Sequence, residues 1–208
     1  PGQYIDIHWA RGSLVRSYSM ASRMVMDGGL ELHLRHMPGG RFTDHVFLRM
    51  QEKEILRIEG PFGSFYLRES VKPIVLLASG TGFAPIKAIL EHMMAKGITR
   101  STTFFWGGRR PHDLYMHDWV TAQLQSMPNV RFVPVISEVQ AQDDWQDAKG
   151  LVHQAVMTAI PDLSNYQVYA CGAPVMIDAA RRDFISQCGL PEEEFFADSF
   201  TSEADNNR

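Results

Sequence analysis

The chain has 208 residues, of which 45% are hydrophobic and 21% are charged, and its formal net charge at pH 7 is −4. This charge gives no electrostatic basis for binding nucleic acid, and no segment approaches the roughly 20 apolar residues that span a bilayer. We therefore expect an ordinary globular protein of one or two domains, with neither a nucleic-acid partner nor a membrane span.

The cysteine content is low, with Cys171 and Cys188 as the two cysteines. Two thiols cannot supply the four ligands of an ordinary iron–sulfur cluster, and sparse cysteine usage suits a reducing compartment. We expect a cytoplasmic protein with no metal site of its own. The chain begins at Pro1 with a strand-like segment and no initiator methionine, so we also expect it to be cut from something longer.

The spacing of apolar residues follows one pattern in the first part of the chain and another in the second part. Residues 1–69 contain short alternating runs, at residues 3–9, 30–34 and 55–58, separated by Gly, Pro and Asp, which predicts an antiparallel barrel. In residues 70–208, buried strands alternate with helical segments, which predicts a parallel sheet covered by helices. The predicted parallel strands are residues 74–78, 102–106, 131–136 and 167–171. The polar stretch 139–149 is interpreted as a surface loop.

A glycine-rich turn connects the first of these strands to a helix-like stretch. Its key residues are Gly80, Thr81, Gly82 and Pro85. Glycines let backbone N–H groups approach an anion, and a helix start favours negative charge. The segment therefore predicts a dinucleotide phosphate site, related to the Rossmann fingerprint but with Pro85 at its third position. The alternative is a turn that needs glycine only for its dihedral angles.

A second motif, RSYSMAS, occupies residues 16–22 of a predicted strand. Alternation along a strand would place Arg16 and Tyr18 on one face. A guanidinium there can pair with a phosphate, and a phenol ring can pack on a flat heterocycle. For such a motif in isolation, a plain surface strand is the alternative.

Together, RxYS and GTGxAP resemble the ferredoxin–NADP(+) reductase type of flavoprotein, and both motifs occur in the expected order. Within that family, PGQY, WGG and FADSF are similar to bacterial oxygenase reductases and to the CDP-6-deoxyglucoseen reductase group, which are often fused to a [2Fe–2S] domain. The resemblance implies an FAD-binding barrel, incomplete at its N-terminus, in residues 1–69. It implies a Rossmann-like NAD(P)-binding domain in residues 70–208.

The resemblance also assigns flavin-binding residues. It implies that Tyr18 stacks on the flavin, that Arg16 meets the flavin phosphate region, and that Ser19 lies near the flavin N5. Residues 33–43, HLRHMPGGRFT, resemble the second flavin segment of the family, in which a glycine pair before a helix start offers amides to the pyrophosphate. The implied flavin-binding residues are Arg16, Ser17, Tyr18, Ser19, His33, Leu34, Arg35, Gly39, Gly40 and Thr43. Phe42 is at least equally well explained as a core residue.

In the second domain, CGAPVM at residues 171–176 follows a predicted parallel strand, at the edge where open α/β sheets bind ligands. The resemblance implies that Cys171 and Gly172 line the hydride-transfer site, whereas a buried small cysteine is the structural alternative. Ser19 and Cys171 are thus the predicted catalytic residues. The other implied nucleotide-site residues are Arg109, Asp113, Tyr115, Glu138 and Met176. In the aromatic ending, residues 195–200, one of Phe196 and Phe200 would shield the flavin or merely complete a core, and Asp198 could lie near the transfer site.

Glu138 bears on the choice of nicotinamide cofactor. A 2′-phosphate needs a basic partner, whereas a ribose 2′-hydroxyl can donate to a carboxylate. Plant-type NADPH enzymes carry Ser-Arg where this chain has Ser137 and Glu138. We therefore expect NADH, while Arg109, Arg110 and Lys149 keep NADPH possible.

The resemblance implies hydride transfer from NADH to bound FAD, followed by release of single electrons to an iron–sulfur domain or ferredoxin-like partner. Any [2Fe–2S] cluster would lie outside this chain. The share of the protein in such chemistry is positioning and electrostatics. Two alternatives stay open: a free-flavin reductase, which releases its flavin, and a non-catalytic nucleotide-binding module built on the same fold.

Overall fold

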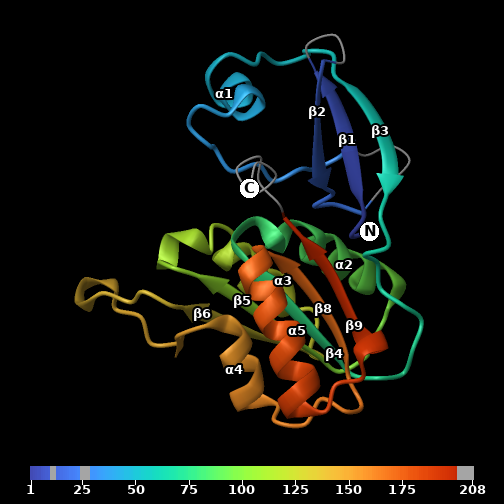
Figure 1. The fold of residues 1–208 in the computed structure, drawn as a ribbon, viewed down its shortest axis with the longest axis vertical. Helices are drawn as coiled ribbons and strands as arrows, with labels where there is room; N and C mark the ends of the chain where they lie inside the picture. Colours follow the sequence, from blue (N-terminus) through green and yellow to red (C-terminus); the bar gives the residue numbers. More distant parts are fainter. Residues whose placement is uncertain (10–12, 24–28, 201–208) are drawn as a thin grey trace.

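The structure is a computed structural model that describes residues 1–9, 13–23 and 29–200. The first part of the chain forms an antiparallel sheet of three strands, β1 (Tyr4–Trp9), β2 (Leu14–Ser19) and β3 (Arg57–Phe62), in the order β2-β1-β3 (Figure 1). Helix α1 (Arg41–Leu48) packs against this sheet through the buried Phe42. Alternation in β1 buries Ile5 and Ile7 on one face, as expected for a sheet with one covered side.

The second part is a six-stranded parallel sheet in the order β7-β6-β5-β4-β8-β9. Its strands are β4 (Ile74–Ser79), β5 (Thr102–Gly108), β6 (Val130–Ile136), β7 (Ala148–Lys149), β8 (Gln167–Gly172) and β9 (Phe195–Ser199). Its helices are α2 (Phe83–Lys96), α3 (His117–Leu124), α4 (Val152–Ala159) and α5 (Pro174–Cys188). Short 3-10 turns are η1 (Gly80–Gly82), η2 (Pro111–Asp113), η3 (Ala141–Asp143) and η4 (Glu192–Glu194).

Strand β4 shows why this sheet is parallel and covered on both faces. Five of its six residues are buried, and successive side chains enter two different cores. Ile74 and Leu76 pack with α2 and α3, whereas Val75 and Leu77 pack with α4 and α5. A near-continuous apolar run is the pattern expected for a strand buried on both sides. The predicted fold class, an antiparallel domain followed by a parallel α/β domain, is confirmed.

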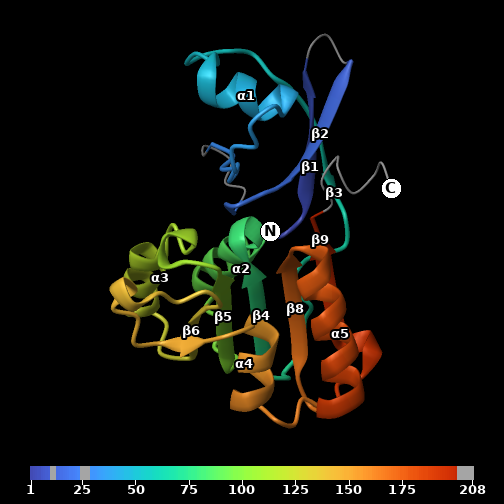
Figure 2. The same ribbon diagram turned by 60° about the vertical axis from the view of Figure 1, so that its left-hand side comes forward.

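Strand order reverses between β4 and β8. From β4 the chain continues to β5, β6 and β7 on one side, and it returns to β8 and β9 on the other. Open α/β sheets bind ligands in the crevice outside the carboxyl ends of the strands at such a reversal. Figures 1 and 2 show the antiparallel sheet and α1 lying beyond this same end of the parallel sheet.

Three local expectations need correction. Residues 30–34 form no strand beyond an isolated bridge between Met20 and Leu32. The stretch 139–149 is not wholly loop, because it contains η3 and the short strand β7. The four predicted parallel strands do not include residues 195–199, which pair in parallel with β8 as β9. Alternation alone could not reveal the bridge, β7 or β9, because each depends on which strands are near enough to pair.

The connection after β3 already packs on the parallel domain. Phe65 is buried in the core that contains Ile74 and Tyr169, and the Arg68 N–H donates to the Tyr169 hydroxyl at 2.9 Å. The domain boundary between residues 69 and 70 stays a prediction. Within the described ranges, no helix combines the length and apolar character needed to cross a bilayer.

Candidate active site at the junction of the two sheets

Two glycines let the loops after β4 and β8 meet at the point of strand reversal. A β-carbon on Gly82 would collide with the Cys171 carbonyl oxygen, and one on Gly172 would collide with the Ser79 hydroxyl. The Ser79 hydroxyl in turn accepts a hydrogen bond from the Ala173 N–H at 3.0 Å. Close packing therefore accounts for Gly82, whose φ of −58° any residue can adopt, so the alternative based on dihedral angles does not explain it. Gly172 combines close packing with a φ of +138°.

Gly80 differs from these two glycines because it has open space beside it. Its φ of +51° lies in the left-handed region, and a β-carbon there would meet nothing within 4 Å. The Trp106 indole N–H donates to its carbonyl at 3.0 Å and holds the turn in place. Thr81 is half-buried beside it, and Pro85 is buried within the first turn of α2, where proline is tolerated.

The start of α2 is suited to an external anion. Its first turn contains no acidic residue, and no side chain caps it in the described structure. Helix α2 continues directly from η1, whose carbonyls accept the Phe83 N–H, and Pro85 has no N–H, so the N–H groups without an intrahelical partner are those of η1. The helix dipole adds positive potential there. The geometry therefore offers a phosphate site between Gly80 and the start of α2.

The start of α1 is different because it binds one of its own carboxylates. Asp44 accepts hydrogen bonds from the Gly39 N–H at 3.1 Å and from His36 at 2.8 Å. The Thr43 hydroxyl donates to the Met37 carbonyl at 2.9 Å and packs tightly against Gly40. The predicted pyrophosphate segment thus satisfies part of its own hydrogen bonding.

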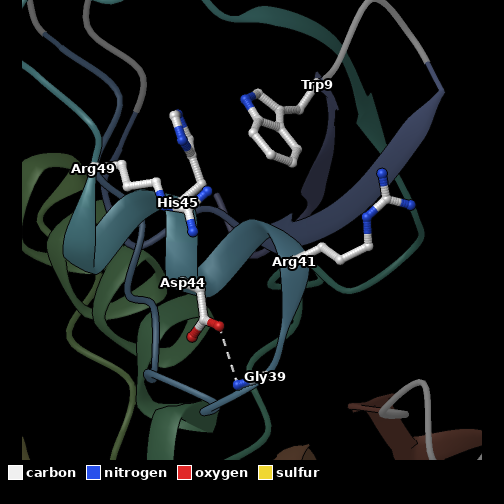
Figure 3. A pocket seen from close by; sticks show the side chains of 6 residues that line it. All are labelled: Trp9, Gly39, Arg41, Asp44, His45 and Arg49. Atoms are coloured by element: carbon white, nitrogen blue, oxygen red, sulfur yellow. Dashed lines mark hydrogen bonds between the residues drawn. The ribbon is translucent and has the colours of Figure 1, made fainter.

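A pocket of about 260 Å³ flanks α1 (Figure 3). The Trp9 ring forms one wall and lies 4.5 Å, centroid to centroid, from the His45 imidazole. Arg41 and Arg49 extend from α1 on either side of His45. The pocket therefore combines an aromatic surface and two arginines with the Asp44 carboxylate; the arginines can pair with a phosphate, and the Trp9 ring can pack on a planar group. Trp9, Arg41, His45 and Arg49 were not predicted as site residues, because their spacing matches no motif.

The residues of β2 divide between its two faces. Arg16 and Tyr18 share one face, where the Tyr18 ring lies 5.8 Å from the Phe42 ring, and burial raises the pKa of Tyr18 while Arg16 opposes this rise. Ser17 is exposed on the other face and donates to Asp6 at 2.6 Å. The Ser17 side chain therefore faces away from Tyr18, and the predicted part of Ser17 in flavin binding stays a prediction.

Ser19 joins the two domains. Its hydroxyl donates to an Asp198 carboxylate oxygen at 2.9 Å, which links the end of β2 to the end of β9. Asp198 pairs in register with Cys171 on β8. Burial raises the pKa of Asp198, and the hydrogen bond from Ser19 opposes this rise.

Cys171 has no exposed surface. Burial, reinforced by the nearby Asp198 carboxylate, raises the pKa of its thiol well above the ordinary value of 9.0. The thiol is therefore protonated at neutral pH and cannot serve as a thiolate nucleophile. Any part of Cys171 in the chemistry is that of a small neutral wall.

The remaining predicted nucleotide residues lie at the ends of β5 and β6. The Asp113 carboxylate accepts hydrogen bonds from the Arg109 and Arg110 N–H groups, each at 2.9 Å, so capping the loop accounts for its position. The side chain of Arg109 is 80% exposed, and its Nε lies 4.0 Å from the exposed Glu138 carboxylate. This pair stands free at the edge of the sheet, where a ligand can reach both groups.

Other predicted residues fall into three kinds of environment. Met176 packs in the core between α5 and the sheet, which accounts for it without a ligand. Phe200 packs on the opposite core, and its N–H donates to the Gly172 carbonyl at 2.9 Å. Leu34 contacts the core of the antiparallel sheet, and Arg35 is exposed. His33 and Tyr115 bond to each other across the domain junction at 2.6 Å.

Two charged residues at this junction were missed. Lys87 is only 3% exposed and binds Glu31 from the other domain. A lysine inside the apolar stretch FAPIKAIL, four residues before Glu91, was a usable signal, because a charge in a buried helix face needs a partner.

The comparisons agree with this geometry. The oxidoreductase NAD-binding domain family matches residues 76–182, more than half of the chain, and the oxidoreductase FAD-binding domain family matches residues 1–66. A reductase of CDP-6-deoxy-L-threo-D-glycero-4-hexulose-3-dehydrase from Yersinia pestis is 44% identical over 204 residues, which cover 96% of this chain and 59% of the relative. Protein RfbI of Salmonella typhimurium is 41% identical over 210 residues, which cover 100% and 60%.

Among solved structures, the Amycolatopsis cytochrome P450 reductase GcoB matches with a TM-score of 0.87 and 28% identity, over 97% of this chain and 61% of that one. The chain thus spans about 60% of the length of the relatives it matches. The match to both domain families, in the order in which the two sheets occur, leaves one assignment. The chain belongs to the ferredoxin reductase-type oxidoreductases, which combine an FAD-binding domain with an NAD-binding domain.

Proposed function

We propose that the chain is the NADH-oxidising part of an electron-transfer reductase, which passes hydride from NADH to bound FAD and then single electrons to an iron–sulfur partner. The observation that carries this proposal is the 2.9 Å hydrogen bond between Ser19 and Asp198, beside the buried Cys171. It brings the predicted flavin strand directly onto the carboxyl edge of the parallel sheet. Two planar cofactors, one from each domain, would meet at that contact.

The residues present fit both cofactors. Arg16 and Tyr18 share a face of β2, and the pocket beside α1 adds Trp9 and two arginines for the larger flavin. The open flank of Gly80 and the uncapped start of α2 fit the pyrophosphate of a dinucleotide. When bound, FAD would accept two electrons as hydride from NADH and give them up one at a time.

The protein itself would supply a defined environment at the transfer point. The Ser19 hydroxyl keeps its proton directed at Asp198, which leaves its lone pairs as acceptors for a ligand. The neutral Cys171 thiol and the adjoining glycine backbone add no charge there. Neither Ser19 nor Cys171 needs to act as an acid or base, because hydride transfer depends above all on how the two cofactors are oriented.

NADH is the proposed nicotinamide cofactor. The exposed Glu138 carboxylate beside Arg109 supports this choice, because its negative charge would repel a 2′-phosphate. An iron–sulfur domain or ferredoxin-like protein is the proposed electron acceptor. We propose that the chain itself acts in the cytoplasm. Two free cysteines support a reducing environment.

The test begins with the full chain loaded with FAD and then desalted. We expect a yellow protein that retains FAD and reduces ferricyanide with NADH as donor. Ser19→Ala should slow flavin reduction about ten- to hundredfold, because small losses of orientation are costly. Ser186→Ala, which removes an exposed hydroxyl of α5, is the matched control and should change nothing. Flavin-loaded protein that oxidises no NADH would contradict the proposal.

One observation favours a second candidate, a free-flavin reductase. Asp44 already occupies the Gly39 amide at the start of α1, so the grip on a flavin pyrophosphate would be weakened by its negative charge. The desalting step separates the two candidates. Protein that emerges colourless, yet oxidises NADH when free FMN is added, would establish the free-flavin reductase instead.

A further inference from the structure

A buried ammonium group holds the domain junction together. Lys87 of α2 donates to Glu31 at 2.9 Å, to Glu91 at 2.6 Å and to the Ala21 carbonyl at 3.2 Å. Burying such a charge costs several kcal/mol unless its hydrogen bonds are satisfied. Here three donors meet three acceptors, two of which come from the segment that follows β2.

Glu31 continues the chain of contacts toward the nucleotide domain. Its second carboxylate oxygen lies 2.8 Å from His33 Nε2, and His33 Nδ1 lies 2.6 Å from the Tyr115 hydroxyl. Burial raises the pKa of Glu31, but hydrogen bonds from His33 and Lys87 outweigh it, so the net pKa is lowered and the carboxylate stays ionised. The contacts form a continuous line from α2, through the first domain, to the loop after β5.

The direction of these hydrogen bonds follows from chemistry. Burial lowers the pKa of His33 although Glu31 opposes this, so the imidazole is neutral at pH 7. A neutral imidazole has one N–H donor and one acceptor nitrogen, and an ionised carboxylate only accepts. Nε2–H must therefore donate to Glu31, which leaves Nδ1 to accept the proton of the Tyr115 hydroxyl.

Tyr115 stands next to the phosphate turn. Its ring packs edge-on against Trp106, with centroids 5.3 Å apart, and against Phe83 at 6.1 Å. Trp106 is the residue that holds the Gly80 carbonyl. Burial raises the pKa of Tyr115, with Glu31 and Cys171 adding to the rise, so the phenol keeps its proton. With that proton bound to His33, the oxygen can offer only lone pairs to a ligand.

We propose that Glu31 and His33 are positioning residues that fix the Tyr115 hydroxyl as a hydrogen-bond acceptor for a hydroxyl or amide donor of the bound dinucleotide, with Lys87 as their anchor. This role rests on the proposed function, because it needs a dinucleotide at the Gly80 turn. It gives the first domain a direct part in nucleotide recognition by the second. A role confined to fastening the domains would not depend on the direction of the hydrogen bonds.

The first test needs no cofactor. Nitrogen-15 NMR of the full chain at pH 7 reports which imidazole nitrogen of His33 carries the proton, with His33→Gln used to assign its signals. We expect protonated Nε2 and unprotonated Nδ1. The opposite tautomer, or a doubly protonated ring, would overturn the proposal.

The second test measures NADH affinity by calorimetric titration. Tyr115→Phe and His33→Phe should each weaken binding about three- to tenfold, the loss expected for one neutral hydrogen bond. His33→Gln should bind nearly as well as the unaltered chain, because glutamine can donate to Glu31 and accept from Tyr115. FAD retention in Tyr115→Phe should be unchanged.

The outcomes separate this inference from the proposed function. Two results would overturn the proposed positioning role while leaving NADH binding by the starting protein intact. One is an unaltered NADH affinity in Tyr115→Phe, and the other is an equal loss of NADH affinity in His33→Gln and His33→Phe. A starting protein that binds no NADH would overturn the proposed function and the ligand-directed role together, whatever the tautomer of His33.

Discussion

The Gly82 α-carbon lies so close to the Cys171 carbonyl that no side chain fits between the loops after β4 and β8. These loops flank the place where strand order reverses. The same contact therefore shapes the crevice in which an open α/β sheet binds its ligand. Ser19 and Asp198 bond across the domains beside it, so the end of β2 touches the carboxyl edge of the parallel sheet there.

Replacing Gly82 by alanine should destabilise the fold and distort the phosphate turn. The added methyl group would collide with the backbone carbonyl of Cys171. We therefore expect a loss of about 3 kcal/mol in unfolding free energy, the upper end for overpacking. Gly97→Ala is the control for packing, because Gly97 has a φ of +62° but open space around it, whereas Gly82 has an ordinary φ of −58° and no space. Gly97→Ala should lose only about 1 kcal/mol. Urea denaturation measures both variants, and equal losses would contradict the packing argument.

The thiol of Cys171 should resist alkylation in the folded protein. The side chain is inaccessible, and burial, with help from Asp198, raises its pKa. Cys188 is also buried, and burial raises its pKa as well. We expect no mass increase after iodoacetamide treatment at pH 8, and two additions in urea. Ser199→Cys places a thiol at an exposed neighbouring position and should react. Alkylation of Cys171 in the folded protein would show that its thiol is accessible to reagents, contrary to this account.

Glu138→Arg should shift cofactor preference toward NADPH. The substitution replaces a negative charge that repels the 2′-phosphate by a positive charge that attracts it. Each of these two charge interactions amounts to about 1 kcal/mol in water near contact distance, so the NADPH-to-NADH ratio of kcat/KM should rise about tenfold or more. Glu193→Arg, at an exposed position before β9, makes the same charge change elsewhere and should leave the ratio unaltered. An unchanged ratio in Glu138→Arg would place the ribose away from β6.

Stability should fall on acidification, in part because of His33. Its pKa in the folded chain is lowered from 6.5 by burial, so the unfolded chain binds the proton first and the contribution is complete only above about pH 6.5. This stabilising contribution of His33 is lost as the pH falls from about 6.5 through the lowered pKa of His33 in the folded chain. The pKa of Glu31, lowered from 4.5, adds a further loss below that pH.

Thermal unfolding between pH 7.5 and 5.5 measures this effect. Burial also lowers the pKa values of His92 and His153, which gives the same sign, so the comparison must isolate His33. His33→Gln cannot take up the proton and should lose less stability over this range than the unaltered chain. Identical losses would mean that His33 is not held neutral by its surroundings.

Local sequence patterns predicted the elements well where burial alone decides the structure. The strands at residues 74–78 and 102–106 follow from apolar runs, which are a local property of the sequence. Strand β9 could not be found this way, because its pairing with β8 depends on a chain return after α5.

The site was predictable only where motifs repeat a shared geometry. Ser19 and Cys171 were named from such motifs, yet their connection through Asp198 needs three strands brought together. The line from Lys87 to Tyr115 carries no sequence signature, because its members come from three separate segments. Partners of a buried charge are chosen by tertiary packing, which a single sequence does not specify.

The most direct test of the central claim is anaerobic stopped-flow mixing of the FAD-loaded chain with NADH deuterated at the transferred position. The account predicts bleaching of the flavin absorbance near 450 nm, slowed by the heavier isotope, because one C–H bond breaks as hydride crosses the junction at Ser19 and Asp198. A flavin absorbance that stays unchanged after mixing with NADH would contradict it.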